Sequence, residues 1–283
     1  MPELPEVESL ARFLAERATG RTVTRAELGS LSALKTYDPP LSDLVGRTVT
    51  GTARRGKYLA LDFGGLALVT HLARGGWLQW RDALTTARAK PGKGPLALRL
   101  GFDDGSGFDI TEQGTEKRLA LWVVRDIAEV ERVAGLGPDP LEPGFDLAPL
   151  LAGRRAQLKG VLTNQSVVAG VGNAYSDEAL HIAKLSPFRM ADTLKPDEVA
   201  RLQAAIIEVL NGAVARSAGL PAAGLKAEKK SGMRVHGRAG EPCPECGDTV
   251  RSVSFATTSL QYCPTCQTGG KPLADRRLSR LLK

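Results

Sequence analysis

Apolar and polar residues alternate through much of the first half of the chain, a period of two that predicts β-strands. The stretch RTVTGTARRGKYLALDFGGLALVTHL, residues 47–72, alternates in this way and is broken at a Gly-Gly pair. A second pair of strands is expected in LALRLGFDDGSGFDIT, residues 96–111, around the turn DDGSG. We therefore expect residues 21–130 to form a β-sandwich or a barrel.

A helix is expected in front of these strands. Apolar residues recur at helical spacing between residues 7 and 14, Pro5 suits the first helical turn, and Gly20 is a suitable stop. Acidic side chains stabilise the positive end of a helix, and three glutamates lie there: Glu3, Glu6 and Glu8. A helix packed on the β-domain thus explains the start of the chain, and it does not exclude a chemical role for the same residues.

The period changes after the Pro- and Gly-rich stretch GLGPDPLEPG, residues 135–144, which we interpret as a domain boundary. Three later stretches have helical spacing: residues 150–164, 173–185 and 195–219. Asn173 precedes the second of these and is a natural N-cap. The chain is therefore predicted to be an α+β, multidomain protein in which a helical domain follows the β-domain.

All four cysteines lie in one short window, with the spacing Cys243-x₂-Cys246-x₁₆-Cys263-x₂-Cys266. This spacing is typical of a four-cysteine zinc site, which has no open position and is therefore structural. Between the pairs, TVRSVSF and SLQY predict a hairpin with its tip at ATTS. The alternatives are disulfides, which are disfavoured in a cytoplasmic chain, or a chance pattern. We predict one structural Zn²⁺.

The formal net charge is +7 and the sequence pI is about 9.4. Residues 221–283 hold eleven Lys and Arg against five Asp and Glu, so six of the seven net charges lie at this end. A basic end suits a polyanionic partner, nucleic acid above all, but a merely soluble basic tail fits the charge equally well. No apolar run is long enough to span a membrane and no signal peptide is found, so we expect a cytoplasmic protein.

The N-terminus also has a chemical interpretation. Removal of Met1 would leave Pro2 as a free secondary amine beside Glu3. An α-amino group has a pKa near 8, against about 10.4 for lysine, so far more of it is neutral and nucleophilic at pH 7. No Ser/His/Asp set and no phosphate-binding P-loop is found, and the three histidines show no ligand spacing: His71, His181 and His236.

Five stretches, in this order, resemble the formamidopyrimidine-DNA glycosylase/endonuclease VIII family of DNA-repair enzymes. They are MPELPEVE, RRGKYL, GLGPDPL, VVAGVGNAYSDEAL and VHGRAGEPCPECG, and together they reach along nearly the whole chain. The resemblance implies an N-terminal catalytic β-sandwich with a leading helix at 1–135, a helical helix–two-turn–helix domain at 145–235, and a four-cysteine zinc-finger hairpin with a basic tail at 236–283. It also implies damaged DNA as the partner of a monomeric, nucleoid-associated protein.

The resemblance also implies roles for single residues. Pro2 is the implied nucleophile and Glu3 the acid/base beside it. Glu6 would support the site, and Lys57 would donate a proton during strand cleavage. The residues implied for DNA binding are Arg74, Arg118, Leu119, Arg154, Lys159 and Asn173, and the implied zinc ligands are Cys243, Cys246, Cys263 and Cys266.

Several positions depart from the family pattern. Arg74 stands where many members carry a methionine wedge, and Arg118 with Leu119 are matched to the loop that supplies an arginine and an apolar wedge. Thr258 takes the place of an arginine at the finger tip, and Arg251 on the other strand is a candidate to replace it. The segment 220–235 is also short for a loop that caps a lesion.

Two functions fit these residues. The first is a bifunctional DNA glycosylase/AP lyase that forms a Schiff base at Pro2 with a nucleotide flipped out of the stack. The second is a catalytically silent relative that only binds damaged DNA. The silent relative accounts for the altered wedge and finger tip, but it does not explain the four residues kept at the implied catalytic site. A zinc-ribbon interaction module, the third interpretation, leaves the N-terminus unexplained.

Overall fold

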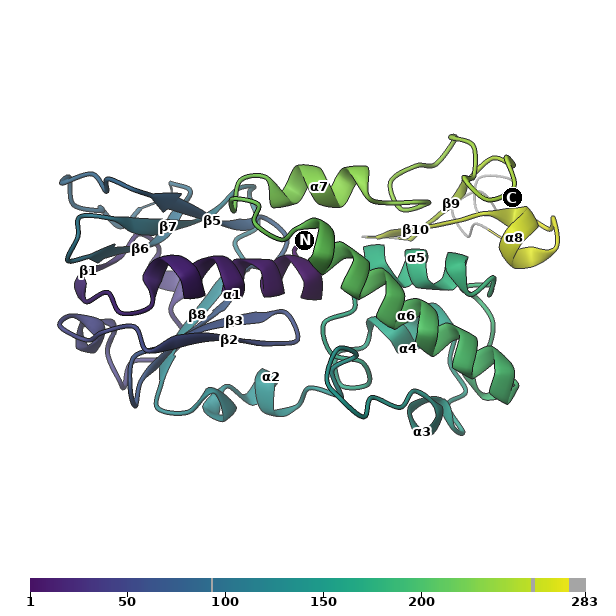
Figure 1. Cartoon of the computed structure of the whole chain (residues 1–283), viewed down its shortest axis with the longest axis horizontal. Coiled ribbons are helices and arrows are strands. Elements are labelled where there is room, and N and C mark those ends of the chain that lie inside the picture. Colours follow the sequence, from purple (N-terminus) through teal and green to yellow (C-terminus); the bar gives the residue numbers. More distant parts are fainter. Residues whose placement is uncertain (93, 256–257, 275–283) are drawn as a thin grey trace. The chain divides into compact units, whose positions relative to one another are not determined.

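The structure, a computed structural model, describes residues 1–92, 94–255 and 258–274. The chain divides into two compact units. The first unit contains Met1–Leu136 together with the later segment Ser217–Lys226, and the second contains Gly137–Arg216 and the chain from Ala227 onward. Figure 1 labels the helices and strands of both units. None of the helices in the described ranges is long and apolar enough to cross a bilayer.

The first unit is built on two four-stranded antiparallel sheets (Figure 1). In the first sheet the order is β1-β6-β7-β5, with β1 (Val23–Leu28), β5 (Gly76–Arg81), β6 (Leu96–Phe102) and β7 (Gly107–Glu112). In the second sheet the order is β2-β3-β4-β8, with β2 (Gly51–Arg55), β3 (Tyr58–Asp62), β4 (Ala67–His71) and β8 (Ala120–Val124). The predicted β-sandwich is confirmed, and its hairpin turns fall at the predicted Gly-Gly and DDGSG stretches.

The leading helix is confirmed as α1 (Leu4–Ala18), which is followed by Gly20 at φ +83°. Leu10 and Leu14 are fully buried in a core that also takes side chains from both sheets, among them Leu61 and Leu98. Because α1 packs on β2 and β3, the start of the chain is fixed against the second sheet. A short helix, α2 (Glu131–Ala134), ends this part of the unit.

The segment Ser217–Lys226 returns to the first unit and completes its core. Ala222 and Leu225 are buried in the same apolar cluster as α1, and Trp77 donates its Nε1–H to the carbonyl oxygen of Ala222 at 3.0 Å. The Nζ atom of Lys226 lies 4.6 Å from the centroid of the Trp77 ring, within cation–π range. The first part of the short 220–235 segment is therefore anchored by packing and by a hydrogen bond.

The second unit is helical and carries the finger. Its helices are α3 (Ala148–Leu151), α4 (Leu158–Thr163), α5 (Asn173–Ile182), α6 (Pro196–Arg216) and the short α8 (Pro264–Thr268), while α7 (Leu225–Ser231) leads into it from the first unit. The finger hairpin is confirmed as β9 (Arg251–Ser254) paired antiparallel with β10 (Ser259–Tyr262). Short 3₁₀ turns elsewhere span Leu31–Ala33, Leu41–Leu44, Ile127–Glu129 and Ala191–Thr193.

Two helical predictions need correction. Residues 150–164 form no single helix, because the chain leaves α3 after Leu151, passes Gly153 at φ +68°, and starts α4 only at Leu158. Asn173 is the first residue of α5 and Gly172 is its N-cap, so the predicted N-cap was wrong. The Asn173 side chain is committed elsewhere, since its Nδ2 donates to the carbonyl oxygen of Ser259 at 2.7 Å.

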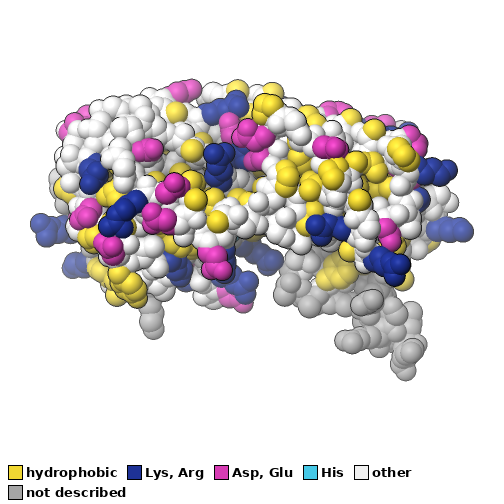
Figure 2. Space-filling view, turned by 90° about the horizontal axis from the view of Figure 1, so that it is seen from below, with side chains coloured by type: hydrophobic (Ala, Val, Ile, Leu, Met, Phe, Trp, Pro, Cys, Tyr) yellow, Lys and Arg dark blue, Asp and Glu magenta, His cyan; other side chains and the backbone are white. Residues whose placement is uncertain are grey.

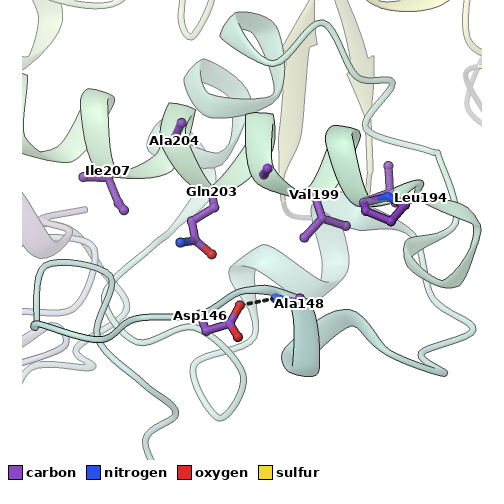
Figure 3. Close-up of a pocket in the computed structure, with 9 residues that line it drawn as sticks. Asp146, Ala148, Leu194, Val199, Gln203, Ala204 and Ile207 are labelled. Carbon is purple, nitrogen blue, oxygen red and sulfur yellow. Dashed lines mark hydrogen bonds between the residues drawn. The ribbon is translucent and has the colours of Figure 1, made fainter.

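The apolar stripe of α6 is buried as expected from Leu202 to Val214, but Val199 near its start is only partly buried. There, α6 borders a groove whose other wall begins at α3 (Figure 3). Gln203 bridges the two walls, because it accepts from the amide of Leu147 at 2.7 Å and donates to the carbonyl of Phe145 at 3.1 Å. The groove is therefore part of the packing of the helical unit.

Candidate functional site

The first residues of the chain form the start of α1. Pro2 is buried, and the side chains of Glu3 and Glu6 are each only 3% exposed. Glu6 accepts the backbone N–H of Glu3 through Oε2 at 2.8 Å, while the Glu3 carboxylate accepts the backbone N–H of Glu6. This reciprocal capping box holds two carboxylates at the positive end of the helix, next to Pro2. The helix-start interpretation is thus confirmed, and the same geometry fixes the orientation of Glu3.

An ion pair joins this helix to the hairpin that carries Lys57. Arg54 on β2 donates its Nε–H to Oε2 of Glu8 at 2.8 Å, and the Arg54 side chain is 6% exposed. Burial opposes ionisation of Glu8, but hydrogen bonds and charge from Arg54 and Arg12 outweigh it and lower the pKa of the Glu8 carboxyl. A partly buried, ionised pair of this kind fixes α1 against the β2–β3 hairpin.

Lys57 lies in the turn between β2 and β3 and is 6% exposed, and Gly56 before it has φ +54°. Tyr58 and His71 pair across β3 and β4, with ring centroids 4.9 Å apart. Burial, and then the charges of Lys57 and Arg132, lower the pKa of His71 to about 4. Lys57 is therefore buried in this turn, and His71 at the end of β4 is neutral at pH 7.

The β4–β5 turn and the loop that follows β7, which were matched to the DNA wedge, are joined by a backbone hydrogen bond. Arg74 is exposed in the turn between β4 and β5, and Gln113 donates its amide to the carbonyl of Gly75 at 3.0 Å. A Cβ added at Gly75 would lie 2.2 Å from the Gln113 carbonyl oxygen, so the position requires glycine. The buried Glu112 carboxylate then accepts the amide of Arg118 at 2.8 Å, which fixes the second loop.

Leu119 does not stand on the surface as an apolar wedge requires. Its side chain is 2% exposed and belongs to the main apolar core, and its amide donates to Oε1 of Glu112 at 2.9 Å. Arg118 is exposed and pairs with Glu116 at 2.9 Å. The burial of Leu119 does not support its match to a DNA-contacting position. Leu119 directly precedes β8 and lies in the same core as Leu121 and Val123, the inward-facing residues of that strand.

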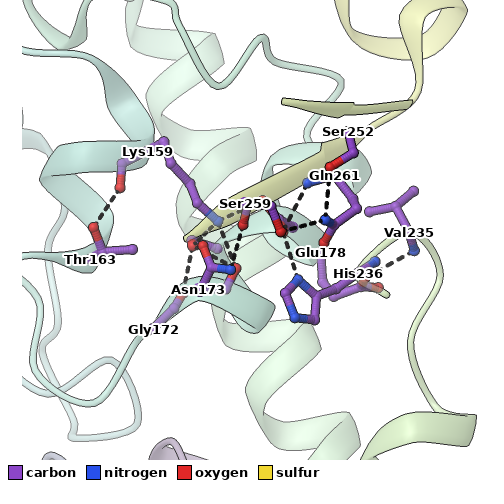
Figure 4. A network of polar contacts seen from close by, with 12 residues as sticks. Lys159, Thr163, Gly172, Asn173, Glu178, Val235, His236, Ser252, Ser259 and Gln261 are labelled. Carbon is purple, nitrogen blue, oxygen red and sulfur yellow. Dashed lines mark hydrogen bonds and ion pairs between the residues drawn. The ribbon is translucent and has the colours of Figure 1, made fainter. Parts of the chain in front are cut away.

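In the helical unit, Lys159 and Asn173 lie together (Figure 4). Arg154 is exposed on the loop before α4. The Nζ of Lys159 donates to the carbonyl of Asn173 at 2.6 Å and to Asp177 at 2.5 Å. The Lys159 side chain is 12% exposed, so these contacts use it within the fold. Arg154 donates its Nε–H to the carbonyl of Leu150 at 2.6 Å.

Two buried acids on α5 tie the helical part to the finger, and nothing in the sequence singled them out (Figure 4). Glu178 is 2% exposed and accepts three successive backbone amides, those of residues 234, 235 and 236, at 2.7, 3.0 and 2.8 Å. Asp177 is 1% exposed, and its Oδ2 accepts a hydrogen bond from the backbone amide of Gln261 at 3.1 Å and lies 2.7 Å from Nδ1 of His236. The only available signal was the adjacent pair of acids, Asp177 and Glu178, inside a predicted helix.

The four cysteines converge as their spacing predicted. Their Sγ atoms lie within 4.8 Å of one another, with 3.9 Å between Cys243 and Cys266 and 3.4 Å between Cys246 and Cys263. A tetrahedron of Zn–S bonds of about 2.3 Å places sulfur atoms about 3.8 Å apart, so the cluster fits one structural Zn²⁺. Burial, and then the neighbouring thiols, raise the pKa of Cys263 to about 11, which a bound cation reverses by holding the thiolates.

The finger tip separates the two residues considered for a phosphate contact. Thr258 is exposed beside the tip, where its carbonyl accepts the amide of Phe255 at 2.7 Å. Arg251 pairs with Tyr262 at the opposite end of the ladder, next to Cys263. Four paired positions at about 3.3 Å each put Arg251 roughly 10 Å from the tip, so it does not take the place of a tip arginine. Ala256 and Thr257 lie outside the described residues.

The structure describes only part of the basic C-terminal end, because residues 275–283 lie outside the described residues. On the face that Figure 2 shows, Lys and Arg side chains are interspersed with Asp and Glu.

Comparison with known proteins gives three matching domain profiles along the chain. They are the formamidopyrimidine-DNA glycosylase N-terminal domain at residues 1–116, the formamidopyrimidine-DNA glycosylase H2TH domain at 136–222, and the zinc finger found in FPG and IleRS at 240–269. A formamidopyrimidine-DNA glycosylase of Symbiobacterium thermophilum is 37% identical over 289 residues, which cover 98% of this chain and 93% of that protein.

A shorter relative is more similar in sequence. An uncharacterized formamidopyrimidine-DNA glycosylase-like protein of Mycobacterium tuberculosis is 62% identical over 149 residues, which cover 52% of this chain and 94% of that protein. Among solved structures, the Lactococcus lactis Fpg with DNA containing an abasic site has a TM-score of 0.83 at 27% identity, covering 94% of this chain and 99% of that chain. The same Fpg with Fapy-dG-containing DNA has a TM-score of 0.82 at 27% identity, covering 94% and 100%.

Proposed function

Because the chain belongs to the formamidopyrimidine-DNA glycosylase family, we propose that it is a bifunctional DNA glycosylase/AP lyase acting on damaged DNA. The observation that carries the proposal is the N-terminus of α1, where Pro2 directly precedes the buried Glu3 and the capping box with Glu6 holds Glu3 in place. The ion pair between Glu8 and Arg54 holds that helix to the hairpin of Lys57. A secondary amine, an acid and a lysine are the groups that the reaction needs.

The chemistry starts when Met1 has been removed and the Pro2 nitrogen is a neutral amine. This nitrogen attacks C1′ of the damaged nucleotide and the bond from C1′ to the base breaks, while the departing base takes up the proton that the Pro2 nitrogen loses. Glu3 then protonates the ring oxygen so that the sugar opens to an iminium. The resulting iminium acidifies C2′, and loss of a C2′ proton expels the 3′ phosphate oxygen. Lys57 supplies the proton that this leaving group takes up.

Binding the DNA is assigned to the β4–β5 turn, to the loop that follows β7 and to the helical unit. Arg74 and Arg118 are the exposed cations that face the duplex from the first unit, and they replace an apolar wedge by guanidinium groups that stack on bases. In the helical unit, Asn173 and Arg154 contact the phosphate backbone. Lys159 acts through Asn173, whose carbonyl it holds.

Borohydride trapping on abasic-site DNA tests the proposal. We expect a covalent adduct through Pro2 with protein whose N-terminal proline has been verified by mass spectrometry. A peptide tag left in front of Pro2 abolishes the adduct, because an amide nitrogen is not nucleophilic. Lys57→Met should still trap but cleave slowly, whereas the exposed Lys35→Met should behave as wild type. An adduct of equal yield with the blocked terminus would refute the assignment of Pro2 as the nucleophile.

The second candidate function is a silent relative that binds damaged DNA without cutting it. Two observations favour it: Leu119 is in the core, and Thr258 stands at the finger tip. Tight binding of abasic-site DNA by the untagged protein, with no adduct and no cleavage, would establish this function.

A further inference from the structure

Helix α5 turns a third buried polar side chain toward the finger besides Asp177 and Glu178. His181, one helical turn after Asp177, is 1% exposed. Its Nε2 lies 3.2 Å from the Sγ of Cys243, which is itself 3% exposed. The proposed reaction on DNA does not use this histidine, so its burial against a zinc ligand needs a separate explanation.

The proton of the imidazole can be placed from its surroundings. Within the described ranges, Nδ1 of His181 has no hydrogen-bond partner, so Nε2 makes the only polar contact of the ring. The atom that it meets is a zinc ligand, which is a thiolate and can only accept. A lone pair on Nε2 would face the negative sulfur and repel it. The hydrogen therefore sits on Nε2, and the contact is an N–H···S hydrogen bond.

We propose that His181 is a positioning residue for the zinc site, which donates Nε2–H to the zinc-bound Cys243 thiolate and so slows the release of the metal. A hydrogen bond to a ligating sulfur draws charge from it and fixes its direction, and loss of such contacts to metal ligands typically weakens metal binding 10- to 100-fold. Since His181 comes from α5 and Cys243 from the finger, 62 positions later, the donor also links the helical part to the metal.

Simple packing is the competing explanation for His181. An apolar side chain of similar size would fill the same space, and it would leave no unpaired nitrogen in the interior. Histidine is favoured over such a residue only where one of its nitrogens makes a valuable contact. The two explanations differ in what they expect from a side chain that keeps the volume and removes the donor.

The test compares His181→Gln, whose amide can donate at the position of Nε2, with His181→Met, which has similar length and no donor. The zinc-loaded full chain is mixed with an excess of a chromophoric chelator, and the rate of zinc transfer is measured. We expect transfer about 10- to 100-fold faster from His181→Met and close to wild type from His181→Gln. His71→Met, which removes a half-buried histidine from the first unit, is the control and should leave the rate unchanged.

A spectroscopic readout separates the donor from packing. In the cobalt-substituted full chain, loss of a hydrogen bond to the thiolate moves the sulfur-to-cobalt charge-transfer absorption to lower energy. His181→Met should show this shift and His181→Gln should not. Equal zinc transfer from the two variants, whether fast or slow, would overturn the proposal, as would a wild-type rate and spectrum for His181→Met. These readouts do not involve DNA, so their outcome is independent of the glycosylase proposal.

Discussion

Replacing Glu178 by Gln tests how the finger is held to α5. The carboxylate accepts three backbone amides, two on Oε1 and one on Oε2, and it is 2% exposed. A glutamine in the same place keeps one acceptor oxygen for the amides of Val235 and His236. Its NH₂ group then faces the amide of Arg234, so a donor meets a donor.

The magnitude follows from these three contacts. A hydrogen bond to a charged group contributes about 1.5–3 kcal/mol and a neutral one about 1, so losing one and weakening two costs about 3–5 kcal/mol. Glutamine avoids the burial of a charge, which offsets part of this cost and leaves a net loss of about 2–4 kcal/mol. The loss applies to opening of the segment that leads into the finger.

Hydrogen exchange of the amides of residues 234–236 measures that opening directly. At tenfold per 1.4 kcal/mol, a loss of about 2–4 kcal/mol accelerates exchange by about 30- to 700-fold. The matched control is Glu241→Gln in the same segment, whose side chain is 52% exposed and, among the described residues, pairs with Arg238. Its effect should stay below about 0.5 kcal/mol. Exchange in Glu178→Gln no faster than in Glu241→Gln would refute the reasoning.

Three further predictions concern pH, salt and product ends. The pKa of His71 is about 4 in the folded protein and about 6.5 in the unfolded chain, so its contribution to stability is complete above pH 6.5 and is lost as the pH falls toward 4. We expect the first unit to lose about 2 kcal/mol between pH 7 and 5, and His71→Gln to remove this slope in urea titrations. The logarithm of DNA affinity should fall steeply against that of salt concentration, and a flat line in anisotropy titrations would exclude the basic end as the DNA surface. Wild-type products should end mainly in the unsaturated sugar of one elimination, while Thr258→Arg should shift them toward 3′-phosphate on gels; a predominant 3′-phosphate from wild type would contradict this.

The strands, the leading helix and the finger could be predicted because each has a local signal. Alternation marks the strands, and the Cys-x-x-Cys pairs mark the metal site without further context. The prediction of one helix over residues 150–164 was wrong because a single glycine, Gly153, takes a left-handed conformation and interrupts it. The N-cap expected at Asn173 failed because the finger takes its side chain from 86 positions away.

In the candidate site, too, residues with a local sequence signal could be predicted and residues whose partners lie far away in the sequence could not. Pro2 and Glu3 were singled out by the chemistry of the N-terminus, and a resemblance carried by short contiguous motifs added their roles and Lys57. Glu8 was read only as a helix-start residue, because its partner Arg54 lies 46 positions later. Glu112, Asp177, Glu178 and His181 were missed for a related reason, since their roles are defined by amides or sulfur atoms that only the fold brings near.

The residues that depart from the family pattern and those that match its catalytic site differ in their effect on the stability of the fold. Arg74 and Thr258 are exposed, so they can change without loss of stability, and they vary where the protein would meet DNA. Glu3 and Lys57 are 3% and 6% exposed, and burying an ionisable group costs free energy even when it is paired. A protein that only bound DNA would gain stability by replacing Lys57 with an apolar residue of similar size. Burial of both groups in one unit therefore favours the enzyme over the silent relative.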